Sequence, residues 1–185
     1  MKVRLLVALL AFFPLAVIAA LPPGYDGVNL GMTVDEVKDA LKKHPEFGYR
    51  GDRDVSLSPS IRGQKDSEKV YDVLIETDAT YVPVTFFDRC WFQFTDGKLS
   101  TITLNLNREK VDHYSVFQTL CEKYGNPDQI SPQKSIWSDD SVQLSLERPL
   151  VIKYVDKKIF NQRKDEATVE KTTTEKMRDA FLEKL

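Results

Sequence analysis

The first regular pattern after the N-terminal segment is helical. Three apolar positions recur at spacings of three and four residues, and these are Val34, Val37 and Leu41. Thr33 precedes them and Glu36 follows Thr33 by three residues, which is the spacing of a capping box. The pattern predicts a helix over about 33–43, stopping before Pro45.

From residue 68 to 106 the pattern becomes that of β-strands. Strands are predicted at 70–76 and 80–87, although Pro83 makes part of the second an edge or a bulge. A hairpin follows, with strands at 90–94 and 98–106 joined through Thr95-Asp96-Gly97.

A three-residue loop with left-handed Gly97 is preferred for this hairpin over a two-residue Asp-Gly loop. It predicts Phe94 opposite Lys98 and Cys90 opposite Ile102, with all the large apolar residues on one face. Those residues are Cys90, Phe92, Phe94, Ile102, Leu104 and Leu106. A sheet covered by helices on one side needs such a face. The other face would then carry Trp91, Gln93, Thr95, Thr101 and Thr103.

A second helix is predicted over about 111–124, because Gly125 and Pro127 end it and an apolar stripe runs along it. The stripe consists of Phe117, Leu120, Cys121 and Tyr124. If this helix packs on the apolar face of the hairpin, Cys121 meets Cys90. We therefore expect a Cys90–Cys121 disulfide, with two buried free thiols as the alternative.

Three short strands follow, at 135–138, 142–147 and 150–155, and Trp137 is a candidate core residue. Residues 157–185 are highly charged. A helical stretch near 173–185 is expected there, with the threonines 172–174 as its N-cap.

The segment 44–67 is polar and rich in Gly, Pro, Ser and Asp, and it predicts a long loop with at most one short strand. It contains Arg50-Gly51-Asp52, a tripeptide that some adhesion receptors bind. Candidate partner contacts are therefore Arg50 and Asp52 in the loop, with Trp91 and Gln93 on the hairpin.

The N-terminus has the three parts of a secretory signal peptide. Lys2 and Arg4 are followed by an apolar stretch from Leu5 to Ile18, which is short for a membrane-spanning helix, and then by small residues. We expect cleavage after Ala20, or after Ala19, and a periplasmic or secreted protein. An uncleaved anchor is the alternative.

Composition narrows the function classes. Acidic and basic residues nearly balance, giving a net charge of −2, which does not favour a nucleic-acid binder. The two histidines, His44 and His113, are far apart, and no metal site or cofactor is expected from them. The acidic pairs, Asp52 with Asp54 and Asp139 with Asp140, have the character of solvated turns rather than of a catalytic or calcium site.

Two short motifs carry a family resemblance. The helix-opening segment 30–37, with Gly31-Met32-Thr33, and the hairpin segment 91–99, with Phe94-Thr95-Asp96-Gly97-Lys98-Leu99, resemble small periplasmic modules of the SmpA/OmlA outer-membrane assembly type. That resemblance implies the layout shared with β-lactamase inhibitor protein, in which helices cover one face of an antiparallel sheet. The chain lacks the lipid-anchoring Cys of those assembly proteins.

The sequence thus predicts an α+β fold of tandem helix-plus-antiparallel-sheet units, with the helices on one face. After the signal peptide (1–20), a single domain over 21–160 holds units at about 28–107 and 108–156, and 161–185 forms a helical tail. The expected function is non-enzymatic binding or scaffolding of an unidentified protein partner, in cell-envelope assembly if the resemblance extends to function. An inhibitor of a hydrolase or lysozyme, acting through the 44–67 loop, is a second hypothesis, and an enzyme is a third.

Overall fold

The computed structural model describes residues 20–51, 53–56 and 73–184. Along these segments the elements are β1 (Gly24–Tyr25), β2 (Val28–Asn29), α1 (Val34–Lys43), the 3₁₀-helix η1 (Pro45–Phe47), β3 (Asp54–Ser56), β4 (Val73–Asp78), β5 (Phe87–Thr95), β6 (Lys98–Leu106), α2 (His113–Tyr124), β7 (Gln129–Ile130), β8 (Lys134–Ser138), β9 (Val142–Glu147), β10 (Val151–Asp156) and α3 (Lys157–Leu182).

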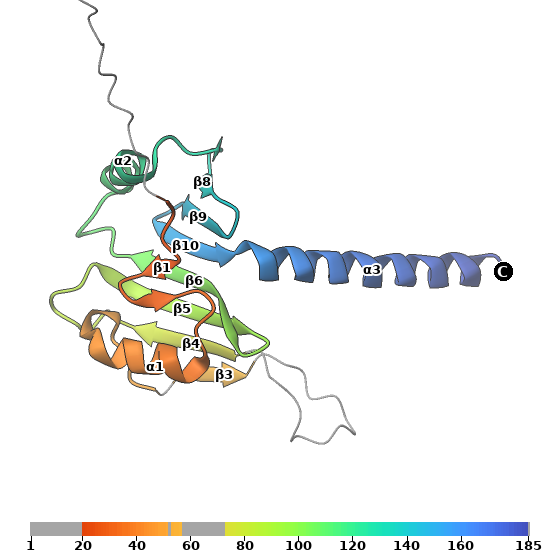
Figure 1. The fold of residues 1–185 in the computed structure, drawn as a ribbon, viewed down its shortest axis with the longest axis horizontal. Helices are drawn as coiled ribbons and strands as arrows, with labels where there is room; N and C mark the ends of the chain where they lie inside the picture. Colours follow the sequence, from red (N-terminus) through yellow and green to blue (C-terminus); the bar gives the residue numbers. More distant parts are fainter. Residues whose placement is uncertain (1–19, 52, 57–72, 185) are drawn as a thin grey trace, which may run out of the picture.

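One antiparallel sheet organises the described chain (Figure 1). Its eight strands run in the order β3-β4-β5-β6-β10-β9-β8-β7, and β1 and β2 form a separate small hairpin. The two predicted units meet where β6 pairs with β10, from Asn105 opposite Val151 to Thr101 opposite Val155. The expected α+β class, with helices packed on one face of the sheet, is confirmed.

The first helix forms as its cap predicts. The Thr33 hydroxyl accepts a hydrogen bond from the Glu36 N–H, and the Glu36 carboxylate accepts one from the Thr33 N–H. This reciprocal pair satisfies donors that the first turn leaves free. The helix then buries Val37 and Leu41 against the sheet.

The predicted hairpin register is wrong, but the predicted apolar face is right. Thr95 lies opposite Lys98 and Phe94 opposite Leu99, so the loop has two residues, Asp96 and Gly97, both with positive φ. A bulge at Ser100 then shifts the pairing, which places Phe92 opposite Ile102. A two-residue loop alone would have placed the apolar residues of the two strands on both faces. The extra residue at the bulge brings them back to one face.

All six apolar residues predicted for this face are buried in one core: Cys90, Phe92, Phe94, Ile102, Leu104 and Leu106. The same bulge changes the expected polar face at one position. Thr95 is buried on that face rather than exposed there, and its hydroxyl lies 3.1 Å from that of Ser100. Both hydroxyls are thereby satisfied beside the bulge.

The second helix does not lie across the hairpin, which corrects the predicted packing. It packs over the strands of the second unit, where Phe117 contacts Trp137 with ring centroids 6.1 Å apart. The Trp137 indole N–H also donates a 2.8 Å hydrogen bond to the Gly125 carbonyl, just past the helix end. The N-cap is Asp112, so the helix begins at His113 rather than near 111.

The expected Cys90–Cys121 disulfide is therefore wrong, because Cys90 lies on β5 of the first unit and Cys121 lies on α2 of the second. Both are free thiols. Cys90 is fully buried in β5, beside Thr77 and the backbone of Asn105, and burial raises the pKa of its thiol to about 12. Burial also raises the pKa of the partly exposed Cys121.

Two further strand predictions change. The predicted strand 80–87 is a turn region instead, because Asp78 accepts hydrogen bonds from the Thr80 backbone and hydroxyl, and Thr85 donates to the Glu46 carbonyl. Its polar groups are thus satisfied without a partner strand, and β5 begins only at Phe87. The strand predicted at 70–76 appears as β4 at Val73–Asp78. Residues 70–72 lie outside the described ranges.

The segment predicted as a long loop, 44–67, contains the 3₁₀-helix η1 and the short strand β3. Residues 57–67 of it lie outside the described ranges. In the second unit, the three strands predicted at 135–138, 142–147 and 150–155 appear as β8, β9 and β10. Trp137 is a core residue, as expected.

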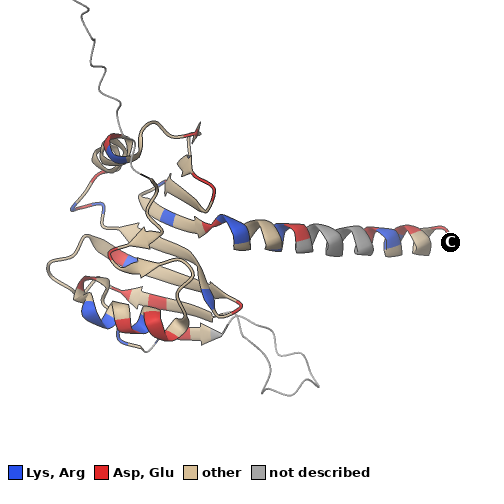
Figure 2. Ribbon diagram, viewed as in Figure 1, with Lys and Arg blue, Asp and Glu red and all other residues tan. Residues whose placement is uncertain are grey.

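The C-terminal helix is longer than predicted and projects away from the sheet (Figure 1). Its N-cap is Asp156, whose carboxylate accepts hydrogen bonds from the N–H groups of Lys158 and Ile159. The threonines at 172–174 lie inside this helix and do not cap it. Both charge signs occur along α1 and along the described parts of α3 (Figure 2).

The described helices include none that is both long enough and apolar enough to cross a membrane. The signal-peptide prediction falls on residues 1–20, of which 1–19 lie outside the description, and it stays a prediction.

Thiol titration tests the cysteine assignment. Without reductant, the unfolded chain should yield two reactive thiols. In the native protein Cys121 should react well before Cys90, because the thiolate is the nucleophile and burial both shields Cys90 and keeps it protonated. A Cys121→Ser variant should remove the fast phase. A chain that yields no free thiol until a reductant is added would contain the disulfide and would contradict the structure.

The burial pattern of β6 predicts that substitutions at neighbouring positions change the free energy of unfolding by very different amounts. Leu104→Ala should lower the free energy of unfolding by about 2–5 kcal/mol, because it leaves a cavity at a fully buried position. Thr103→Ala, on the opposite face, should lower the free energy of unfolding much less. Urea denaturation of both variants checks this, and equal losses would show that the face assignment is wrong.

Candidate functional site

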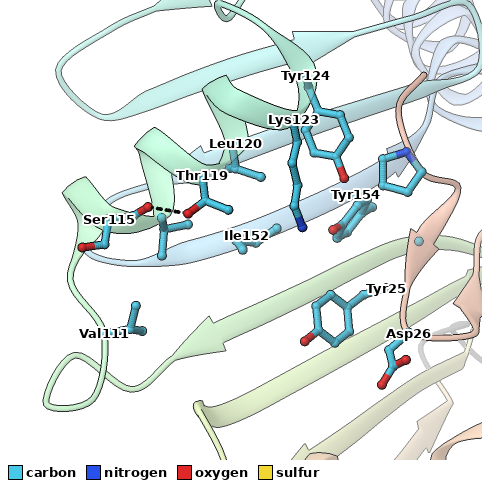
Figure 3. A pocket seen from close by; sticks show the side chains of 13 residues that line it. Tyr25, Asp26, Val111, Ser115, Thr119, Leu120, Lys123, Tyr124, Ile152 and Tyr154 are labelled. Carbon is cyan, nitrogen blue, oxygen red and sulfur yellow. Dashed lines mark hydrogen bonds between the residues drawn. The ribbon is translucent and has the colours of Figure 1, made fainter. Parts of the chain in front are cut away.

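A cavity of about 420 Å³ lies on the helix-covered side of the sheet, above the junction of the two units. Figure 3 shows it enclosed by α2, by β10 and by the β1–β2 hairpin. Its lining residues come from all three: Pro22, Gly24, Tyr25, Asp26, Val111, Ser115, Val116, Thr119, Leu120, Lys123, Tyr124, Ile152 and Tyr154.

A second cavity of about 260 Å³ adjoins the first, because Tyr25, Val111 and Ile152 line both. Its further walls are mainly apolar, and they are Val84, Thr85, Phe86, Phe87, Leu106 and Glu46. The side chains of Val84 and Phe86 are 88% and 59% exposed, which is high for residues of this size and apolarity. We call the two adjoining cavities the seam groove.

Tyr25 stands between the two cavities, and the small hairpin fixes it there. The hairpin is anchored to β6 by a 2.8 Å hydrogen bond from the Gly31 N–H to the Leu99 carbonyl. Gly24 must be glycine, since a Cβ at that position would lie 2.0 Å from the Val28 carbonyl oxygen. The Tyr25 ring then packs edge-on against Phe87, with centroids 5.5 Å apart.

The polar groups of the larger cavity are three phenols, the Lys123 ammonium, the Asp26 carboxylate and the hydroxyls of Ser115 and Thr119. Lys123 and Tyr124 reach from α2 towards Tyr154 on β10, and Tyr25 faces them from the hairpin (Figure 3). Burial raises the pKa of all three phenols, and each is a neutral donor at neutral pH. Among the described residues, no carboxylate forms a salt bridge with Lys123.

A cluster of ligating side chains stands at the edge of the seam groove. The Nδ1 atom of His44 lies 3.1 Å from a carboxylate oxygen of Asp26 and 3.1 Å from one of Glu46. All three ligating atoms lie within 4.8 Å of one another. No metal site was expected from the sequence, because the two histidines, His44 and His113, are far apart. The spacing His44-x-Glu46 was the only local signal.

The candidate partner contacts chosen from sequence do not form one site. Trp91 and Gln93 lie on β5, on the face opposite α1 and α2, where Trp91 is partly buried and exposed Gln93 shares a pocket with Ile159 and Phe160 of α3. Arg50 instead stacks on Tyr81, with its guanidinium carbon 3.5 Å from the ring centroid. Asp52 lies outside the described ranges.

On its face of the sheet, Trp91 is flanked by charged side chains rather than by apolar ones. Glu76, directly opposite Trp91, accepts from Arg53 at 3.0 Å and from Arg89 at 3.4 Å. Asp78 continues this network with the same two arginines. Partly exposed pairs of this kind contribute little stability but set the charge pattern of the face.

The family of the chain follows from its sequence match. The TP0088 domain model matches residues 23–166, which include every strand of the sheet and all the residues that line the two cavities except Pro22. The chain belongs to the TP0088 domain family. No curated protein and no solved structure matches it. The comparisons therefore give the resemblance to SmpA/OmlA modules and to β-lactamase inhibitor protein no support.

The buried phenols of this TP0088 domain predict a loss of stability in alkali. Their raised pKa values mean that the unfolded chain loses phenolic protons first, so stability is intact below about pH 10 and falls above it. Denaturant unfolding at several alkaline pH values should show a shallower fall for Tyr154→Phe than for the wild type. Tyr114→Phe, at an exposed position, should behave as the wild type. Identical slopes for all three proteins would contradict the burial of Tyr154.

Proposed function

We propose that this TP0088 domain is an exported, non-enzymatic binding protein whose ligand is an apolar molecule ending in an anionic group. The observation that carries the proposal is the Lys123 ammonium, which reaches into an apolar cavity beside three phenols and has no carboxylate partner among the described residues. The ligand would lie in the seam groove with its anionic end at Lys123.

Charge and hydrogen bonding support an anion at this end. Lys123 is an exposed residue whose side chain lines the cavity, so its ammonium attracts a negative group with a strength that falls as salt is added. The hydroxyls of Tyr124 and Tyr154 add neutral donors on the same side of the cavity (Figure 3). Asp26, the lining carboxylate, is engaged with His44 instead.

The rest of the groove supports an apolar body for the ligand. From Lys123 the lining continues over Leu120 and Ile152 and past Tyr25 into the second cavity. Exposed Val84 and Phe86 border that far end. Covering these side chains would remove apolar surface from water, which is the main source of affinity in pockets of this kind.

Binding fits the lining better than covalent catalysis does. The lining serine, Ser115, donates its hydroxyl hydrogen bond to Asp112 at 2.6 Å. Asp112 is the N-cap of α2, so this contact completes the helix start and does not pair a nucleophile with a histidine base.

The earlier functional hypotheses stay predictions. Docking of a protein partner at Trp91 and Gln93 would use the opposite side of the sheet from the seam groove. Inhibition of a hydrolase through the 44–67 loop depends on a segment of which residue 52 and residues 57–67 lie outside the described ranges. Export rests on the N-terminal sequence pattern.

Calorimetric titration with decanoate, with 1-decanol as the uncharged comparator, tests the proposal. The wild type should bind decanoate more tightly than decanol. Lys123→Met should weaken decanoate binding about tenfold or more and change decanol binding little, because it removes one charge-assisted contact and keeps the apolar stem.

The matched control is Lys176→Met, at an exposed position of α3, the helix that projects away from the sheet (Figure 1). It should bind both probes as the wild type does. Equal affinities of the wild type for decanoate and decanol, or decanoate binding unchanged by Lys123→Met, would reject an anion site at Lys123.

A further inference from the structure

We propose that Asp26, His44 and Glu46 form a binding site for one divalent transition-metal ion, with Zn²⁺ the best-suited ion. The three side chains supply one imidazole nitrogen and two carboxylate oxygens, a ligand set that zinc accepts. This inference does not depend on the ligand proposed for the seam groove.

The distances agree with ligands of a common ion. With zinc–nitrogen and zinc–oxygen bonds of about 2.0–2.2 Å, the ligand atoms of a tetrahedral site lie about 3.3–3.6 Å apart. The His44 Nδ1 atom is 3.1 Å from an oxygen of each carboxylate, so small side-chain rotations suffice to place an ion among the three atoms.

The contacts around Nδ1 also favour a cation over a proton. A ring nitrogen carries a single N–H, which cannot point well at two carboxylates together. In the described part of the chain, neither Asp26 nor Glu46 forms a salt bridge with a lysine or arginine. A divalent ion at this point would neutralise both carboxylates and coordinate the nitrogen.

Each ligand is held by its own element before any ion binds. His44 ends α1, where its N–H donates to the Leu41 carbonyl and its ring packs edge-on against Phe47. Glu46 lies in η1, and its carbonyl accepts a 2.8 Å hydrogen bond from the Thr85 hydroxyl. Such supporting contacts reduce the cost of ordering ligands around a metal.

Asp26 comes from the turn between β1 and β2, so the site joins the small hairpin to α1 and η1. Three protein ligands leave one position of a tetrahedral zinc ion for water or a bound molecule. Asp26 lines the larger cavity of the seam groove and Glu46 the smaller one. A bound ion would therefore lie at the rim of the groove.

Titration of the metal-free full-length chain with ZnCl₂ and, separately, with CoCl₂ tests the site. The proposal expects one saturable site per chain, and cobalt absorption bands of a low-symmetry N/O site without thiolate charge-transfer absorption. His44→Gln and Asp26→Asn should each weaken zinc binding about tenfold or more. Even mutation of residues that only support the ligands of a metal site lowers metal affinity about 10–100-fold. Zinc should raise the melting temperature of the wild type but not of either variant.

Two controls separate the site from other metal-binding groups. His113→Gln, which removes the other histidine, and Cys121→Ser, which removes the more accessible thiol, should bind zinc as the wild type does. No saturable binding by the wild type would overturn the proposal, and so would binding that Asp26→Asn and His44→Gln leave intact while both retain the native circular dichroism spectrum. Zinc affinity lost in Cys121→Ser would assign the ion to the thiol instead.

Discussion

The pairing of β6 with β10 is the contact on which the rest of the structure depends. Five residue pairs, from Asn105 with Val151 to Thr101 with Val155, join two helix-and-strand units into one sheet. Each unit covers its own strands with its own helix, so the covered side is built from two packed halves. The seam groove lies between them, where α2, β10 and the β1–β2 hairpin come together.

The β1–β2 hairpin connects this junction to both proposed sites. Tyr25 divides the two cavities, and the next residue, Asp26, contributes an oxygen to the ligand cluster. Hydrogen bonds to β6 and the close approach of Gly24 to Val28 hold the hairpin in place. A short segment thus positions one side chain of each proposed site, because hydrogen bonds hold it to the sheet beneath.

The polar groups of the two sites are complementary in charge. The larger cavity carries an ammonium without a described carboxylate partner, and the neighbouring cluster carries two carboxylates without a described lysine or arginine partner. Asp26 and Lys123 line the same cavity, but the two carboxylates of the cluster contact His44, and no salt bridge joins them to Lys123 among the described residues. An anionic group bound at Lys123 and a cation bound at the cluster would each meet side chains of opposite charge.

The sequence by itself determined the local elements: the capped helix α1, the alternating faces of β5 and β6, and the glycine-terminated helix α2. These depend on spacing and capping within a few residues. Only the tertiary structure decided that α2 covers the second unit, which separates Cys90 from Cys121, and that a bulge at Ser100 restores the apolar face. The tertiary structure also decided the candidate sites, because Asp26, His44 and Lys123 come from separate elements. Spacing and capping do not specify which helix packs over which strands.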